Sequence, residues 1–205
     1  MKITNLFPGL KRTANGDYVL EGHLISDDTI EVDLDDRFVI TGRVFSQKSI
    51  IARCGIKAGK DIEAGEGIKA GWGIEAGEGI KARCGIEAGW GIKAGEGIEA
   101  GWGIEAGEGI KARCGINAGE GIEAGWGIEA GWGIDAGSFL NAGKRIFAGT
   151  SVYHGSANCK KTIVCTELQH GEICFGELVI QKTTVKMTVA EIKAALKIDN
   201  LEIIQ

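Results

Sequence analysis

Four potential metal ligands lie close together near the C-terminal end of the sequence: Cys159, Cys165, His170 and Cys174. Structural zinc sites are typically built from closely spaced ligand pairs such as Cys-x-x-Cys, and this set contains no such pair. Cys165 also falls at an inward position of a predicted strand, where a free cysteine packs as a small apolar side chain. We therefore favour a structural role for these residues and predict no metal and no cofactor.

Three Arg-Cys dipeptides are the other candidates for chemistry: Arg53-Cys54, Arg83-Cys84 and Arg113-Cys114. A neighbouring arginine lowers the pKa of a thiol and so favours the reactive thiolate. No histidine or acid stands in a fixed place to make nucleophiles of these cysteines. We expect these three thiols to point outward from turns. We also expect the six cysteines to be reduced, in a cytoplasmic protein.

A six-residue repeat covers residues 50–151 and must position these side chains. A typical unit is Ile62-Glu63-Ala64-Gly65-Glu66-Gly67, and seventeen units follow one another without interruption. Ile and Ala alternate with a charged residue, which predicts a three-residue strand with Ile and Ala inward. The Gly-x-Gly that follows predicts a turn, because glycine accepts positive φ and allows close backbone approach. Such a unit buries its apolar side only by stacking on neighbours, so the repeat predicts a solenoid.

The charges at the second position of each unit predict how many units form one turn. Residues stacked one turn apart lie about 4.8 Å from each other, so opposite charges pair there and like charges repel. With two units in each turn, seven of the stacked pairs have like charges and three have opposite charges. With four units in each turn, six have like charges and three have opposite charges. A turn of three units stacks six opposite pairs and three like pairs, with Lys57, Glu75 and Lys93 in one column. We therefore predict an all-β fold: a three-sided parallel β-helix, or β-solenoid.

The run of Ile-x-Ala-Gly-x-Gly units resembles the hexapeptide-repeat left-handed parallel β-helix family, which includes many acyltransferases. The order differs from the usual pattern of that family, because Ile comes first here and Ala precedes Gly. The repeat more loosely resembles bactofilin-type β-helices, which polymerise end to end, and is similar to uncharacterised phage and bacterial proteins. The first resemblance implies a catalytic histidine at a cleft between subunits. Only His23, His154 and His170 are present, His154 falls at an inward strand position, and no loop interrupts the units. We therefore predict no catalytic residue and no enzyme.

The unusual side chains of the repeat are five tryptophans at the turn position that elsewhere holds Glu, Lys or Cys, so we expect their rings on the surface. With three units in each turn, Trp72, Trp90 and Trp126 share one corner of the solenoid, interrupted by Glu108. Surface tryptophan is enriched where proteins meet. The alternative is that the rings only shield the turn backbone. The tryptophans are Trp72, Trp90, Trp102, Trp126 and Trp132.

The arginines of the Arg-Cys dipeptides complete the predicted binding residues. Trp72, Trp102 and Trp132 each follow one of the three cysteines by three repeat units. One turn along the solenoid, an arginine would then lie over each ring in a cation–π contact. We therefore add Arg53, Arg83 and Arg113 to the five tryptophans as candidate binding residues.

The chain divides into four predicted segments. Residues 1-37 form an N-terminal β cap, 38-151 the regular β-helix, 152-185 irregular β coils, and 186-205 a C-terminal capping helix and strand. In the cap, Asn15-Gly16 predicts a two-residue hairpin turn. Near the other end, Thr188 and Glu191 form a capping box at the start of a predicted helix. The acidic residues of the cap are interpreted as a solvated edge and not as a cation site; they are Asp27, Asp28, Asp33, Asp35 and Asp36.

Composition narrows the range of partners. The net charge is −5, and Glu and Lys are interleaved along the repeat, which argues against a nucleic-acid-binding face. No apolar run has the length of a signal-peptide core or a transmembrane helix, so we expect no membrane partner. The expected partner is another protein or copies of the same chain. Three functions stay open: a protein-interaction or inhibitory binding protein, a self-assembling structural protein, and a hexapeptide-type acyltransferase.

Overall fold

The computed structural model describes residues 1–149, 151–165 and 167–180. Within these ranges the chain forms β-strands only, and it contains no helix long and apolar enough to cross a membrane. The strands are β1 (Lys2–Ile3), β2 (Leu10–Arg12), β3 (Tyr18–Leu20), β4 (Leu24–Ser26), β5 (Ile30–Val32), β6 (Phe38–Ile40), β7 (Val44–Ser46), β8 (Ile50–Ala52), β9 (Ile56–Ala58), β10 (Ile62–Ala64), β11 (Ile68–Ala70), β12 (Ile74–Ala76), β13 (Ile80–Ala82), β14 (Ile86–Ala88), β15 (Ile92–Ala94), β16 (Ile98–Ala100), β17 (Ile104–Ala106), β18 (Ile110–Ala112), β19 (Ile116–Ala118), β20 (Ile122–Ala124), β21 (Gly127–Ala130), β22 (Ile134–Ala142), β23 (Arg145–Ala148), β24 (Ser151–Cys165) and β25 (Glu167–Ile180).

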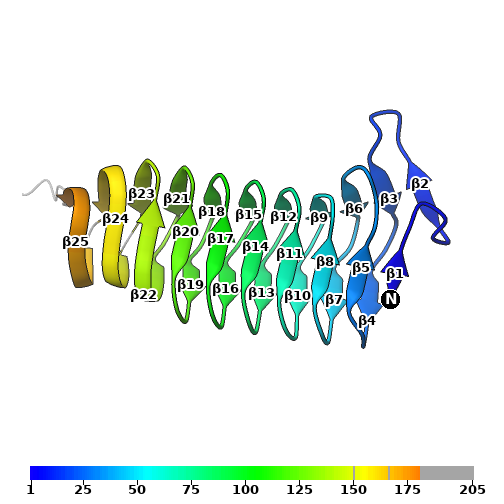
Figure 1. The fold of residues 1–205 in the computed structure, drawn as a ribbon, viewed down its shortest axis with the longest axis horizontal. Helices are drawn as coiled ribbons and strands as arrows, with labels where there is room; N and C mark the ends of the chain where they lie inside the picture. The colour runs from blue at the N-terminus through cyan, green and yellow to red at the C-terminus, as the bar shows by residue number, and fades with distance from the viewer. Residues whose placement is uncertain (150, 166, 181–205) are drawn as a thin grey trace, which may run out of the picture.

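The strands stack as the coils of a three-sided parallel β-helix. In the regular part each strand pairs in parallel with the third strand after it, as β11 does with β14. Ile68 lies beside Ile86 and Lys69 beside Glu87, so one coil takes three repeat units. The coils follow one another along a straight axis, with the N-terminal hairpin projecting at one end (Figure 1). The predicted fold class and the predicted number of sides are therefore confirmed.

Two columns of apolar side chains on each face fill the interior. Ile occupies the first position of each regular strand and Ala the third, and both are buried along the whole repeat. Ile68 and Ile86, for example, are each only 1% exposed. Parallel pairing without register shifts places identical residues above one another, so each Ile packs against the Ile of the next coil. The second residue faces outward, as the alternation predicts.

The glycines of the repeat serve close backbone approach and not positive φ. Within the described residues the positive-φ glycines are Gly9, Gly16 and Gly22, all in the first coils. The prediction that the Gly-x-Gly turns need positive φ was therefore wrong. The fourth residue of most units is instead glycine because the preceding coil leaves little room for a side chain; Arg53, Arg83 and Arg113 are the exceptions. A Cβ on Gly95 would lie 1.9 Å from the carbonyl oxygen of Gly77, one coil earlier.

The N-terminal coil is larger than the regular ones and carries the cap. Tyr18 pairs with Phe38, and this coil is longer than a regular one because the corner between β5 and β6 contains two additional residues. Strand β1 pairs with β5, and β2 and β3 form the projecting antiparallel hairpin. The hairpin loop is longer than the two-residue turn that Asn15-Gly16 suggested. Thr13 N donates to Asp17 O, and Gly16, at φ 94°, donates to Thr13 O, which gives a three-residue loop closed by glycine.

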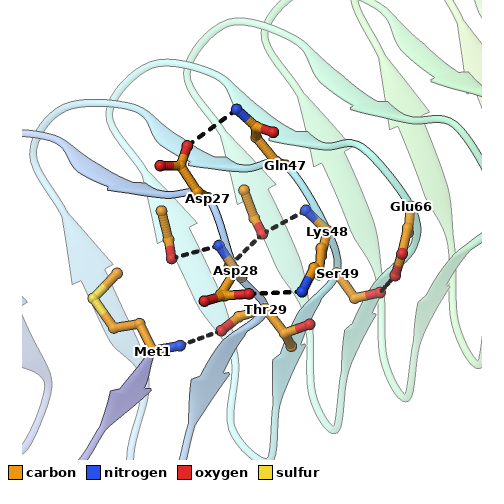
Figure 2. A network of polar contacts seen from close by, with 10 residues as sticks. Met1, Asp27, Asp28, Thr29, Gln47, Lys48, Ser49 and Glu66 are labelled. Carbon is orange, nitrogen blue, oxygen red and sulfur yellow. Dashed lines mark hydrogen bonds and ion pairs between the residues drawn. The ribbon is translucent and has the colours of Figure 1, made fainter.

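Polar side chains join the first coils at one corner of the solenoid (Figure 2). Gln47 donates to Asp27, Lys48 pairs with Asp28 at 2.6 Å, and the Ser49 hydroxyl donates to Glu66. Ser46 stands at an inward position and is fully buried. Its hydroxyl donates to the Asp28 carbonyl and accepts from the Lys48 N–H, so its burial leaves no polar atom unpaired.

The coils become less regular toward the C-terminal end. Strand β22 continues through a corner without a break, and β24 and β25 are long strands whose pairing contains several register shifts. Most of the segment predicted as irregular β coils, residues 152-185, lies within β24 and β25. The predicted capping helix and the strand after it lie outside the described residues.

Candidate functional site

One corner of the solenoid gathers three of the five tryptophans. Backbone hydrogen bonds stack its residues coil by coil: Trp90 N donates to Trp72 O, Glu108 N to Trp90 O, and Trp126 N to Glu108 O. Cys54 begins this column and Lys144 ends it. We call these six residues the Trp corner. The predicted sharing of one corner by Trp72, Trp90 and Trp126, with Glu108 between them, is what the structure shows.

The aromatic rings of the Trp corner interact along the solenoid axis. Trp72 and Trp90 stack with ring centroids 5.4 Å apart and ring planes inclined by 9°. The ammonium of Lys144 lies over the Trp126 ring, 4.4 Å from its centroid. Both contacts are favourable, yet 54% of Trp90 and 56% of Trp126 stay exposed. Large aromatic surface is therefore presented to solvent on a rigid β scaffold.

A groove runs beside the Trp corner, parallel to the solenoid axis, with a volume of about 880 Å³. Trp72, Trp90 and Trp126 form one wall, and the sixth-position glycines form the floor, where only backbone is present. The outward side chains of the next face form the other wall. These are Glu75, Lys93, Lys111 and Glu129. We call this the Trp groove. Comparable grooves along the other two corners measure about 650 and 410 Å³ and contain one tryptophan each.

Ion pairs partly neutralise the charged wall of the Trp groove. The Glu75 carboxylate lies 3.2 Å from the Lys57 ammonium and 3.8 Å from that of Lys93. The Lys111 ammonium lies 2.9 Å from the Glu129 carboxylate. Lys93 and Lys111 are direct neighbours on adjacent coils, one of the three like-charged contacts expected from the sequence. Across the groove, Glu108 has no ion-pair partner among the described residues.

The other two tryptophans lie on separate corners. Trp102 N donates to Cys84 O, and Trp132 N donates to Cys114 O, so each ring follows a cysteine by one coil as the spacing predicted. Both rings are exposed, more so than those of the Trp corner. The five predicted tryptophans therefore do not form one surface, and only the Trp corner brings several together.

The arginines do not occupy the predicted positions. Among the described residues, the cation–π contacts are those of Arg12 with Tyr18, Arg43 with Phe45 and Lys144 with Trp126. The expected contacts of Arg53, Arg83 and Arg113 with tryptophans are absent from this set. The reason is register: a cysteine is the residue stacked one coil before Trp72, Trp102 and Trp132. The arginine before that cysteine adjoins a glycine of the next coil, as Arg53 adjoins Gly71. Arg53 pairs with Asp33 instead.

Cys54 is buried, which corrects the expectation that all three repeat cysteines point outward. Only 1% of Cys54 is exposed, whereas Cys84 and Cys114 are half-buried. Cys54 lies next to the long corner between β5 and β6, and that corner exists only in the first coil. Burial raises the pKa of the Cys54 thiol, and the neighbouring Arg53 has a smaller opposing effect. Cys54 is therefore the least reactive of the three.

The acidic residues of the N-terminal cap bind basic side chains of neighbouring coils. Asp33 accepts from Lys2 and Arg53, and both hydrogen bonds lower the pKa of its carboxyl group. Lys48 lowers the pKa of Asp28 in the same way. No group of three or more metal-ligating side chains occurs in the part of the chain that the structure describes. His154 and the Cys159–Cys174 set lie on β24 and β25, and their side chains are outside the described part.

Sequence reasoning missed the residues that complete the Trp groove. Lys144 follows Trp126 by one coil, so the column spacing could have identified it. Arg37 was not predictable in this way, because it belongs to the corner with two additional residues. The sequence predicted that Lys93 and Lys111 point outward. That they line one groove together with the Trp corner is visible only in the structure.

The architecture defines the chain as a parallel β-solenoid of three-sided coils. No protein-family model, curated protein or solved structure matches it in the comparisons made. Membership of the hexapeptide-repeat or bactofilin families therefore stays a prediction from the repeat.

Proposed function

We propose that this β-solenoid is a non-enzymatic scaffold that binds a partner protein through the Trp corner and the Trp groove. One observation carries the proposal: three tryptophans on one edge border a groove of about 880 Å³ while Trp90 and Trp126 stay more than half exposed. Tryptophan is among the residues most enriched at the energetic centres of protein interfaces. Large exposed aromatic surface also reduces solubility, so its presence on turns that elsewhere hold Glu favours a function.

The rigidity of the scaffold supports this proposal. Strands β8 to β20 follow one another at six-residue intervals with no inserted loop. Stacked coils hold the backbone of each tryptophan at a fixed interval. Binding of a partner therefore costs little free energy for ordering these residues. The proposed partner is another protein. Copies of the same chain are the alternative occupant, because an exposed aromatic edge also suits self-association.

The test compares two variants that lose tryptophan rings from different corners of the solenoid. In the first, Trp72, Trp90 and Trp126 are changed to Ser. In the control, Trp102 and Trp132 are changed to Ser. Ser138 occupies the equivalent turn position in the native chain, so both variants should fold, as circular dichroism would verify. Each protein is then used for affinity capture from the native host, and its mass in solution is measured by light scattering.

The first variant should lose the captured partner that the wild-type protein and the control retain. Loss of a wild-type oligomer, without any change in captured proteins, would instead favour self-assembly through this corner. If the first variant kept both its partners and its mass, the Trp corner would not be the binding surface and the proposal would fail.

A further inference from the structure

One position is missing from the aromatic column of the Trp corner. Trp72 and Trp90 are stacked, the next coil carries Glu108, and Trp126 follows on the coil after that. Trp72 occupies one face of the Trp90 ring. Lys144 starts one coil beyond Trp126 and covers that ring with its ammonium. We take the remaining face of Trp90 and the face of Trp126 away from Lys144 to border the coil of Glu108, which lies between these two residues in the column.

The interval between these two faces suits one flat group. Parallel rings in contact at a centroid distance of 5.4 Å are offset, with planes about 3.5 Å apart. With the Trp126 ring oriented like that of Trp90, two coils would separate the two ring planes by about 7 Å. A planar group placed between the two rings would lie about 3.5 Å from each face, as the ring of a tryptophan at position 108 would. The glutamate in its place leaves the interval open toward solvent.

The chemistry of the interval selects a planar cation. The faces of indole rings attract positive charge. The carboxylate of Glu108 at the base is exposed and has no ion-pair partner among the described residues. A guanidinium group is flat, stacks on aromatic faces, and donates two parallel hydrogen bonds to a carboxylate. A lysine ammonium is compact and strongly hydrated, so it gains less from such a site.

We propose that Trp90, Glu108 and Trp126 bind an arginine side chain of the partner protein, with the guanidinium between the two rings and paired with Glu108. This inference rests on the proposed function and specifies its chemistry. The lysines on the facing wall do not oppose it strongly, because Lys111 is paired with Glu129, and Lys93 lies 3.8 Å from Glu75. An acidic residue beside the arginine would complement Lys93, so the preferred partner segment carries both charges.

The inference is tested with two short probes, acetyl-Gly-Arg-Gly-amide and acetyl-Gly-Lys-Gly-amide. The indole N–H signals of the five tryptophans are followed by NMR and assigned with Trp90→Phe and Trp126→Phe. The arginine peptide should shift the Trp90 and Trp126 signals in a saturable manner and leave those of Trp102 and Trp132 in place. The lysine peptide should bind several-fold more weakly, because it cannot stack.

Three variants separate the contribution of Glu108 from general surface charge. Glu108→Gln keeps the size of the side chain and removes its charge, so affinity for the arginine peptide should fall about tenfold. Glu108→Trp should fill the interval and abolish saturable binding. Glu120→Gln, at the equivalent position on the Trp102 corner, is the matched control and should leave affinity unchanged. Equal binding of both peptides, or full affinity in Glu108→Gln, would overturn the inference.

Partner capture distinguishes failure of this inference from failure of the proposed function. If Glu108→Gln retained the partner that the triple Trp→Ser variant loses, the corner would bind protein without an arginine in the interval. That result would overturn the inference and leave the proposed function standing. If the arginine peptide bound but the triple variant kept its partner, the partner would not use this site, and both proposals would fail.

Discussion

Replacement of glycine by alanine should be more destabilising at the fourth position of a repeat unit than at the sixth. A Cβ on Gly95 would lie 1.9 Å from the Gly77 carbonyl oxygen. A Cβ on Gly97, two residues later, would lie 3.4 Å from the Gly115 carbonyl oxygen, which is close to ordinary contact. These two glycines belong to the same turn, so the pair isolates close approach from other effects of substitution.

The native arginines at the fourth position show how the coils respond to a Cβ there. Arg83 N lies 3.3 Å from Ala64 O, and Arg113 N lies 3.4 Å from Ala94 O. Gly95 N, by comparison, lies 3.0 Å from Ala76 O. A side chain at this position therefore moves adjacent coils apart and weakens one backbone hydrogen bond. We expect Gly95→Ala to lower the free energy of unfolding by about 1–3 kcal/mol, the usual effect of overpacking.

Gly97→Ala should change the free energy of unfolding by less than about 1 kcal/mol, because the reduced entropy of the unfolded chain offsets a mild contact. Both variants would be compared with wild type by urea denaturation, with the dependence on denaturant checked for a common value. Equal destabilisation by the two substitutions would refute the argument, since it would mean that loss of glycine itself, and not the distance between coils, sets the cost.

Two further predictions concern the interior. Ile98→Ala should lower the free energy of unfolding by about 2–5 kcal/mol, because the residue is buried between identical neighbours. Glu99→Ala should lower it by less than about 1 kcal/mol, since its ion pair with Lys81 is exposed, and similar losses in urea denaturation would contradict the assigned faces. Iodoacetamide should label Cys84 and Cys114 faster than Cys54, as measured by peptide mass spectrometry. Labelling of Cys54 at the rate of the other two would disprove its burial. Because burial raises the pKa of the Cys54 thiol, the neutral thiol contributes to the stability of the fold at low pH. This contribution should be lost as the pH rises from about 8.5 through the raised pKa.

The charge pattern predicted the number of units in each coil, but it is not the main reason why the coil has that size. Five of the six opposite pairs that stack one coil apart form ion pairs, including Lys69 with Glu87 at 2.7 Å. These side chains are largely solvated, so each pair contributes little to stability. Buried Ile columns and the fourth-position glycines determine the register, because a one-residue slip would place charge inside and a Cβ against the next coil.

The sequence by itself determined the features that repeat. Its six-residue period, its inward Ile and Ala, and its charge columns predicted a three-sided solenoid and placed Trp72, Trp90 and Trp126 on one corner. These features are predictable because every regular coil has the same surroundings, so a spacing in sequence becomes a position in space. For the glycines, the predicted close backbone approach is present, whereas positive φ is absent from the regular units that the structure describes, because the spacing of residues does not specify backbone dihedral angles.

Features that arise where neighbouring coils differ from one another are visible only in the tertiary structure. The longer corner between β5 and β6 lies next to Cys54, which is buried, and brings Arg37 to the Trp groove, although Cys54 occupies the same Arg-Cys-Gly sequence as Cys84 and Cys114. Arg53 turns to Asp33 and not to a tryptophan, and Lys144 covers Trp126, because long flexible side chains pair with whichever group the adjacent coil presents. A local pattern specifies one coil, whereas contacts between unlike coils form only when the whole stack is assembled.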